Sequence, residues 1–191
     1  MKLYPLSFIL FFLISGCCKD VIENTYTLND FDKTIIPYTT SQELLFTDNN
    51  GVEVLALSTP RISTIEARRD GPDSCRITEI EEVSSTLTFS AIDLTLDIIV
   101  TAAIDRAFGI NTLTSMDTSY VNSFQLSCEA IVDMPLEAQV TAYSKHDFDF
   151  ENVFVFQDCT ENSSIENIVF SVSRGVVFIA FTDGRYLKLN D

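Results

Sequence analysis

The chain has 191 residues, of which 46% are hydrophobic, 11% aromatic and 21% charged, with 28 acidic against 12 basic side chains. The formal net charge of -16 argues against a nucleic-acid binder, because phosphate binding requires clustered lysines and arginines. The apolar and aromatic content is too high for a disordered acidic chain, and the length suits one domain with a hydrophobic core.

The first residues have the pattern of an export signal. Lys2 precedes an apolar run over residues 6–14, which is far shorter than the roughly 20 residues that span a bilayer. Two small residues follow the run. This combination predicts a secretory signal peptide at residues 1–16, which cleavage removes.

The end of this segment, Ile14-Ser15-Gly16-Cys17, resembles the lipobox of bacterial lipoproteins. The resemblance implies that the Cys17 thiol receives a diacylglycerol, that residues 1–16 are cut away, and that the new terminus is acylated as well. Several acyl chains anchor a protein to a membrane far more firmly than one does. An ordinary secretory signal with two further cysteines, and a retained helical anchor, are the alternatives.

The residues after Cys17 bear on where the protein is delivered. No Asp directly follows Cys17, so the inner-membrane retention signal of enteric lipoproteins is absent. The pair Lys19-Asp20 is similar to the surface-export signal of Bacteroidota lipoproteins, although Val21 stands where a second acid is usual. The resemblance implies a lipid-anchored protein of the outer membrane, exposed at the cell surface.

The mature chain is expected to contain a tether and one domain. Residues 17–32 are polar and lack periodicity, so they predict a flexible tether, with a short helical turn near residues 29–32. Residues 33–191 contain no long break and predict a single β domain. Its first hairpin joins residues 43–47 to 52–57 through Asp48-Asn49-Asn50-Gly51, where Asn-Gly favours a type I′ turn.

Later segments alternate between apolar and polar residues, as half-buried strands do. Residues 86–101 and 124–132 show this pattern, while 101–108 is a candidate helix that ends at Gly109. Three closing strands are expected within 165–189, with turns at 173–175 and 183–184. The chain is therefore expected to be all-β: an antiparallel barrel or half-barrel (lipocalin-like) of about 8–10 strands with at most one short helix, or alternatively a β-sandwich.

The closing strands 165–189 also resemble those of small outer-membrane lipoproteins of the Bacteroidota type, and residues 36–40 fit the opening of that family. The likeness covers about half of the domain and concerns strand pattern. It implies no activity and transfers no site residues.

Three cysteines remain after Cys17 and Cys18. An exported protein keeps disulfides, and Cys75, Cys128 and Cys159 allow three pairings. The alternation places Cys128 in mid-strand on the apolar side, where a thiol packs as a small hydrophobic group. Because Cys75 and Cys159 adjoin loops, the favoured pairing is Cys75–Cys159. A catalytic thiol would require a histidine base, and the chain has only His146.

The segment from His146 to Asn152 contains the candidate metal ligands. Asp147, Asp149 and Glu151 alternate with two phenylalanines, so the three acids share one side and could hold Ca²⁺. The favoured alternative is a solvated strand edge with its phenylalanines facing inward. The spacing of an EF-hand is absent, and no His/Cys pairs occur at zinc-ligand spacing.

Two weaker groups complete the survey of chemistry. Asp93 and Asp97 lie on one face of an expected strand and could act as paired carboxylates, although exposed acids on a sheet are commoner. A second group is the only local surplus of positive charge, which could bind an anionic head group or a glycan, or could balance acidic strands. Its members are Arg61, Arg68, Arg69 and Arg76.

No nucleophile elbow, phosphate loop or dinucleotide fingerprint is present, and no cofactor is expected. The sequence therefore favours a lipid-anchored outer-membrane lipoprotein with a non-catalytic binding or envelope-accessory role, whose partner is an envelope protein or a glycan. One alternative is a small surface hydrolase or metal-dependent enzyme that uses the acidic segment 146–151. Another is an accessory subunit of an uptake complex that presents an edge strand or an aromatic patch.

Overall fold

The structure is a computed structural model. It describes residues 19–69, 71–72, 74–102, 107–114, 117–128, 134–160 and 163–191. The predicted signal peptide at residues 1–16 and the predicted lipidation site, Cys17, lie outside the described residues.

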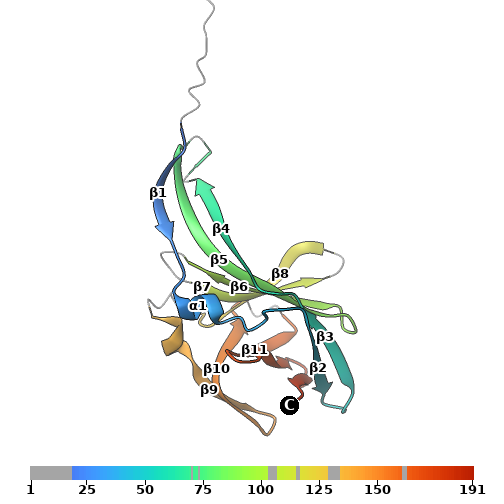
Figure 1. The fold of residues 1–191 in the computed structure, drawn as a ribbon. Coiled ribbons are helices and arrows are strands. Elements are labelled where there is room, and N and C mark those ends of the chain that lie inside the picture. The colour runs from blue at the N-terminus through green and yellow to red at the C-terminus, as the bar shows by residue number, and fades with distance from the viewer. Residues whose placement is uncertain are drawn as a thin grey trace, which may run out of the picture.

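Within the described residues the chain forms strands, one short α-helix and one 3-10 helix (Figure 1). In chain order these elements are β1 (Val21–Tyr26), α1 (Asp30–Thr34), β2 (Gln42–Asp48), β3 (Glu53–Ser58), β4 (Ile62–Arg69), β5 (Arg76–Phe89), β6 (Leu94–Thr101), β7 (Ala107–Thr114), β8 (Asp117–Gln125), η1 (Leu136–Gln139), β9 (Thr141–Lys145), β10 (Phe148–Asp158), β11 (Ile165–Ser171), β12 (Gly175–Phe181) and β13 (Tyr186–Leu189).

Ten of these strands form a closed antiparallel barrel. Their order around the barrel is β2, β3, β5, β6, β7, β8, β10, β11, β12 and β13. The last strand pairs with the first, since Leu189 lies opposite Phe46 and Leu187 opposite Asp48. Because the sheet closes on itself, the predicted all-β barrel is confirmed and the sandwich alternative is wrong.

The barrel interior is filled by side chains rather than hollow. Phe108 packs edge-on against Phe154, Phe156 and Phe170, with ring centroids 4.8–5.3 Å apart. All four rings are buried, as expected for the inward positions of alternating strands. Edge-to-face aromatic pairs add about 1 kcal/mol each beyond the area they bury. The alternation over residues 86–101 correctly predicts an inward face, since Leu96, Ile98 and Val100 expose none of their surface.

A segment between β1 and β2, residues 28–38, closes one end of the barrel; we call it the plug. Ile35, Ile36 and Tyr38 expose none of their surface. The helical turn that the sequence predicts is confirmed as α1, and the Asn29 side chain caps it by accepting a hydrogen bond from Asp32 N at 2.8 Å. The plug meets the barrel at the start of β12, where Tyr38 Oη accepts a hydrogen bond from Val176 N at 2.9 Å, and it leaves the opposite end open.

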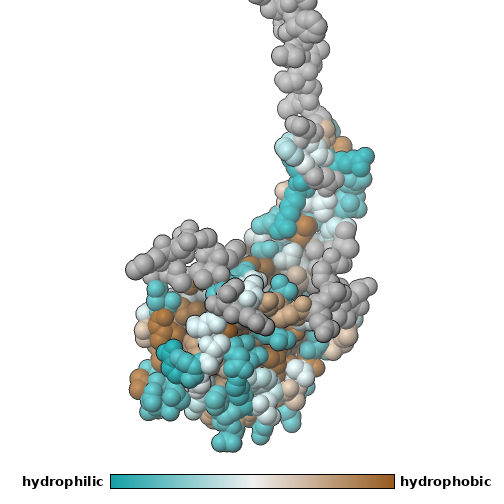
Figure 2. Space-filling view, turned by 180° about the vertical axis from the view of Figure 1, so that it is seen from behind, coloured by the Kyte–Doolittle hydropathy of each residue, from teal (hydrophilic) through white to brown (hydrophobic). Residues whose placement is uncertain are grey.

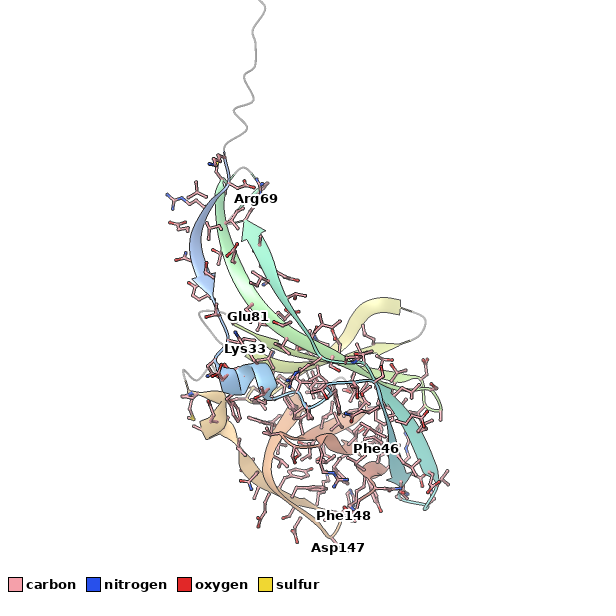
Figure 3. The ribbon with its side chains drawn as sticks, in the orientation of Figure 1. Lys33, Phe46, Arg69, Glu81, Asp147 and Phe148 are labelled. Carbon is pink, nitrogen blue, oxygen red and sulfur yellow. A yellow bond between two sulfur atoms is a disulfide. The ribbon has the colours of Figure 1, made fainter. Side chains whose placement is uncertain are left out.

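Glu81 of β5 fastens the plug to the barrel wall. Its carboxylate accepts hydrogen bonds from Leu28 N at 2.9 Å and Ser63 Oγ at 3.4 Å, and Lys33 Nζ lies 3.0 Å away (Figure 3). Burial favours the neutral acid, but the bonds from Lys33, Leu28 and Ser63 outweigh it and lower the pKa of Glu81. Arg61 adds a hydrogen bond to the carbonyl of Ile36 at 2.9 Å.

β5 continues beyond the barrel and carries β4 on one side and β1 on the other. We call this three-stranded projection the wing (Figure 1). Residues 21–32 therefore differ from the flexible tether that their composition suggests. β1 is held in two ways. It pairs with β5 in parallel, and two ion pairs fix its start, since Arg69 binds Asp20 at 2.8 Å and Arg76 binds Glu23 at 3.1 Å.

The hairpin of β9 with the start of β10 covers the outside of β12 and β13; we call residues 141–150 the flap. Phe178 of β12 contacts Phe148 and Phe150 of the flap, and its ring stacks on Tyr186 at 5.6 Å. This cover explains why β12 is buried on both faces, as its uniformly apolar sequence predicts. The flap turn, His146 and Asp147, has two positive φ angles, the type I′ conformation.

Two local predictions need correction. The hairpin between β2 and β3 is confirmed, but its turn is not type I′, because Gly51 alone has a positive φ, of 79°. The Asp48 side chain accepts from Asn50 N and Val52 N, both at 2.8 Å, which favours an ordinary turn followed by a glycine bulge. The candidate helix at 101–108 is wrong at both of its ends, since Thr101 ends β6 and Ala107 begins β7 opposite it, while residues 103–106 lie outside the described residues.

Candidate functional site at the barrel mouth

The open end of the barrel, opposite the plug, carries a pocket of about 330 Å³. We call it the mouth. Ligand sites in proteins commonly begin near this volume and often lie at the ends of β-barrels. The connections β2–β3, β5–β6, β10–β11 and β12–β13 meet here, together with facing residues of β7 and β8. The lining is Asp48, Asn49, Val54, Ile92, Asp93, Leu94, Thr112, Leu113, Asn122, Ser163, Ser164, Ile165, Phe181, Arg185, Tyr186 and Leu187.

The floor of the mouth is mostly apolar. Val54, Ile165 and Leu187 are each less than 10% exposed, and they are the last inward-facing side chains above the filled core. Thr112 is the one buried polar residue among the lining residues. Its hydroxyl oxygen accepts a hydrogen bond from Asn122 N at 3.2 Å, so β7 and β8 are joined at the floor.

The rim is polar and is held by local hydrogen bonds. The bond from Val52 N, supported by one from Asn50 N, lowers the pKa of Asp48, so this carboxylate stays ionised at neutral pH. Arg185 donates from Nε to Asp183 at 2.7 Å, and its guanidinium lies 5.3 Å from the ring centre of Phe181. The Arg185 side chain is therefore oriented before any ligand arrives.

The combination of groups suits a neutral polar molecule. Carboxylate and amide oxygens accept hydrogen bonds, while the guanidinium, amide and hydroxyl groups donate them. Phe181 supplies aromatic surface beside the apolar floor. With Asp48 and Asp93 against Arg185, the charged lining is acidic overall, which disfavours anions. Among the described residues, the lining includes neither histidine nor cysteine.

The acidic segment of the flap does not assemble a metal site. Asp147 lies in the turn at the tip of the flap (Figure 3), and Asp149 accepts a hydrogen bond from Ser144 Oγ at 2.6 Å. Asp147 precedes β10, and the pairing of β9 with β10 is interrupted between Phe150 and Val153, so the three acids do not follow the regular alternation that the sequence predicts. Among the described residues, no group of three or more His, Cys, Asp or Glu side chains could hold a metal ion.

The other charged candidates are distributed over the fold. Asp93 belongs to the turn before β6 and lines the mouth, whereas Asp97 lies within β6 and does not line it. The arginine cluster is divided among ion pairs and the plug. Arg68 pairs with Glu66 at 2.9 Å, Arg69 and Arg76 pair with acids of the β1 segment, and Arg61 binds the plug.

The predicted disulfide is wrong. A disulfide joins Cys128 to Cys159, whose Cα atoms lie 5.2 Å apart. Cys75 is also disulfide-bonded, but to neither of these two cysteines. The alternation 124–132 misplaces Cys128, because β8 ends at Gln125. The chain bends after that point, which exposes Cys128 and brings it beside the end of β10.

Sequence reasoning missed the mouth, and two signals could have pointed to it. Asp48 and Asn49 carry turn geometry that fully explains them, so nothing marks them as rim residues. Thr112 is a polar residue at an inward position, and Asp93 opens a strand directly after a turn. Such exceptions to alternation identify a site only when the neighbouring strands are known.

No protein-family model, curated protein or solved structure matches the chain. Among the helices of the described residues, none has the length and apolar character needed to cross a membrane.

Proposed function

We propose that this protein is a lipid-anchored, non-catalytic binding protein of the outer membrane, exposed at the cell surface, whose barrel mouth takes a small neutral glycan. The observation that carries the proposal is the mouth itself: a pocket of about 330 Å³ with a buried apolar floor and a rim of mixed donors and acceptors.

The position of the mouth is consistent with an anchor at Cys17. The first described residues, next to Asp20, lie at the free tip of the wing, and β1 then runs toward the barrel (Figure 1). The β2–β3 turn, which forms part of the rim, lies at the other extreme of the molecule (Figure 1). A chain anchored before the wing would therefore carry its mouth at the end of the molecule far from the anchor.

The chemistry of the rim supports a sugar. A sugar hydroxyl donates and accepts at once, and it is matched by acceptors such as Asp93 beside donors such as Arg185 and Asn122. Sugar rings also have apolar faces, for which the Phe181 ring offers a partner. An anionic glycan would meet a chain of net charge -16 and an acidic rim.

Two measurements test the proposal separately. A Cys17→Ser chain should take up no labelled fatty acid, and labelling of that variant would refute the anchor. The purified full chain should be stabilised against heat by members of a panel of neutral mono- and disaccharides, because a ligand that binds only the folded state raises the melting temperature. Their uronic-acid counterparts should give no shift.

Two arginine variants localise the binding. Arg185→Ala should abolish the shift, because it removes the donor from the rim. Arg174→Ala is the matched control, since Arg174 is exposed in the β11–β12 turn and bonds the Asn190 carbonyl outside the mouth. If no neutral sugar shifts the melting temperature, or if both variants lose the shift equally, the mouth is not the sugar site.

A further inference from the structure

The wing has a long strand edge that no described strand covers. β4 pairs with β5 along all eight of its residues, from Ile62 opposite Ser84 to Arg69 opposite Ile77. Among the described residues, β5 is the only strand that pairs with β4. All eight residues of β4 are exposed, and the strand projects beyond the barrel (Figure 1). Its outer row of backbone N–H and C=O groups is therefore available for another strand.

Proteins usually protect such an edge with a short strand, a proline, a bulge or a charge. The β4 strand spans about 26 Å at the usual rise per residue. It contains no proline, and its pairing with β5 shows no register shift. Charge is the only protective device present. The identity of the partner thus depends on which strand could lie opposite these charges.

The charges of β4 have opposite signs on either side of a small residue. Glu66 and Arg68 flank Ala67, share one face of the strand and bind each other at 2.9 Å. In an antiparallel pair of identical strands with Ala67 on the two-fold axis, each Glu66 lies opposite Arg68 of the other copy. Ile65 then lies opposite Arg69. No like charges oppose one another, and two ion pairs form across the junction.

Neighbouring registers are less favourable. An axis through Glu66 would set two glutamates directly opposite each other, and an axis through Arg68 would do the same with two arginines. Like charges directly opposite on paired strands are destabilising. A two-fold axis must pass through a residue, because directly opposite residues of an antiparallel pair point to the same side of the sheet. An axis through Ile65 would set Glu66 opposite Thr64 and Arg68 opposite Ile62, so it places no opposite charges face to face. Charge therefore selects one register.

We propose that β4 is a homodimerisation edge, which pairs with β4 of a second copy of this chain about a two-fold axis through Ala67. The pairing joins the two wings into one six-stranded sheet and leaves both mouths free. The contact is isologous, so it closes at two copies. Figure 2 shows mostly hydrophilic side chains on one face of the wing, in keeping with a junction made by backbone hydrogen bonds and charge rather than by an apolar patch.

Cysteine cross-linking in cells that express the full chain tests the register. Across the proposed axis, the Cβ atoms of the two Ala67 residues lie about 4.5–5.5 Å apart, close to disulfide range. Ala67→Cys should give a covalent dimer on a non-reducing gel after mild oxidation. Ile65→Cys is the matched control, since it shares the face and the exposure, but in this register its two copies stand about 13 Å apart.

Charge reversal tests the partner. Glu66→Arg or Arg68→Glu alone should weaken the dimer roughly tenfold in sedimentation velocity of the purified full chain. An equimolar mixture of the two variants should restore it, because two arginines then face two glutamates. Each substitution also breaks the exposed pair within its own strand, but loss of fold could not be rescued by mixing.

The outcomes decide the proposal. A dimer from Ala67→Cys, none from Ile65→Cys, and rescue by mixing support the two-fold β4 pairing. Equal cross-linking of both cysteine variants, a wild-type chain that remains monomeric at all concentrations, or a mixture no better than its components overturns it.

Discussion

Gly175 is the position at which one added methyl group should do most damage. Its φ of +77° is unfavourable for alanine, and a Cβ there would lie 2.0 Å from Tyr38 Oη and 2.3 Å from Cζ. Tyr38 exposes none of its surface, and its hydroxyl accepts a hydrogen bond from Val176 N at 2.9 Å. Burial raises the pKa of this phenol well above its ordinary value, while the bond from Val176 lowers it by less. The buried Tyr38 ring could make room for the added methyl group only if the plug moved away from the barrel.

The magnitude follows from three contributions. The left-handed conformation costs alanine about 1 kcal/mol relative to glycine. Overpacking a filled core costs about 1–3 kcal/mol, and leaving the Val176 N–H without its acceptor costs about 1–3 kcal/mol. Gly175→Ala should therefore lower the free energy of unfolding by at least about 3 kcal/mol, which corresponds to roughly 10 °C in a domain of this size.

Urea denaturation of the purified full chain measures the loss of unfolding free energy. Near-ultraviolet circular dichroism follows the unfolding through the tyrosines and phenylalanines, because the chain has no tryptophan. Gly184→Ala is the matched control, because Gly184 also has a positive φ, of +87°, but no atom lies within 4 Å of its added Cβ. The control should lose only about 1 kcal/mol. If Gly175→Ala is no less stable than Gly184→Ala, the contact between Tyr38 and the β11–β12 turn does not hold the plug as described.

Three further changes have expected outcomes in the same denaturation assay. Replacing Cys128 and Cys159 by serine should cost about 3–4 kcal/mol, because their bond closes a loop with a sequence separation of 31; no loss would mean that the bond does not constrain the unfolded chain. Because the pKa of Glu81 is lowered in the fold, its contribution is complete above the unfolded-state pKa and disappears as the pH falls through the folded-state pKa. The Glu81→Gln variant should therefore be less stable than the wild type at neutral pH, and its stability should fall less steeply as the pH is lowered. Stability curves of variant and wild type that run parallel with pH would contradict this. Asp147→Gly should stabilise the flap by about 0.5 kcal/mol, since Asp147 has a φ of 63°; a loss of stability would refute the strained turn.

The turn types show how far local sequence reasoning reaches. Asn50-Gly51 is a strong signal for a type I′ turn, and it correctly predicts a hairpin there. The Asp48 carboxylate, which bonds the turn backbone, selects a different geometry. The type I′ conformation occurs instead at His146 and Asp147, where no glycine announces it. Packing of the flap on Tyr186 and Phe178 accounts for it, because those contacts hold the two strands at a two-residue separation.

The candidate site shows the opposite balance. The sites predicted from the sequence consist of residues that are close together in the chain, such as the flap acids. An extended chain separates the side chains of such residues. The mouth gathers residues from separate parts of the chain, of which Asp48 and Leu187 are the most distant in sequence. The misassigned disulfide has a related cause, because alternation continues past Gln125 in the sequence although the strand does not.

The sequence by itself determined the class of this protein: antiparallel strands with inward-facing apolar residues, a short helical turn near residues 29–32, and a terminus that resembles an export and lipidation signal. These features depend on side-chain alternation and on turn or cap residues, which act within a few positions of the chain. Only the tertiary structure decided that the sheet closes, that β5 extends into a wing, and that the open end forms a pocket. Closure joins Thr47 to Asn190 across 143 positions, and local preferences carry no record of which distant strand offers the matching edge.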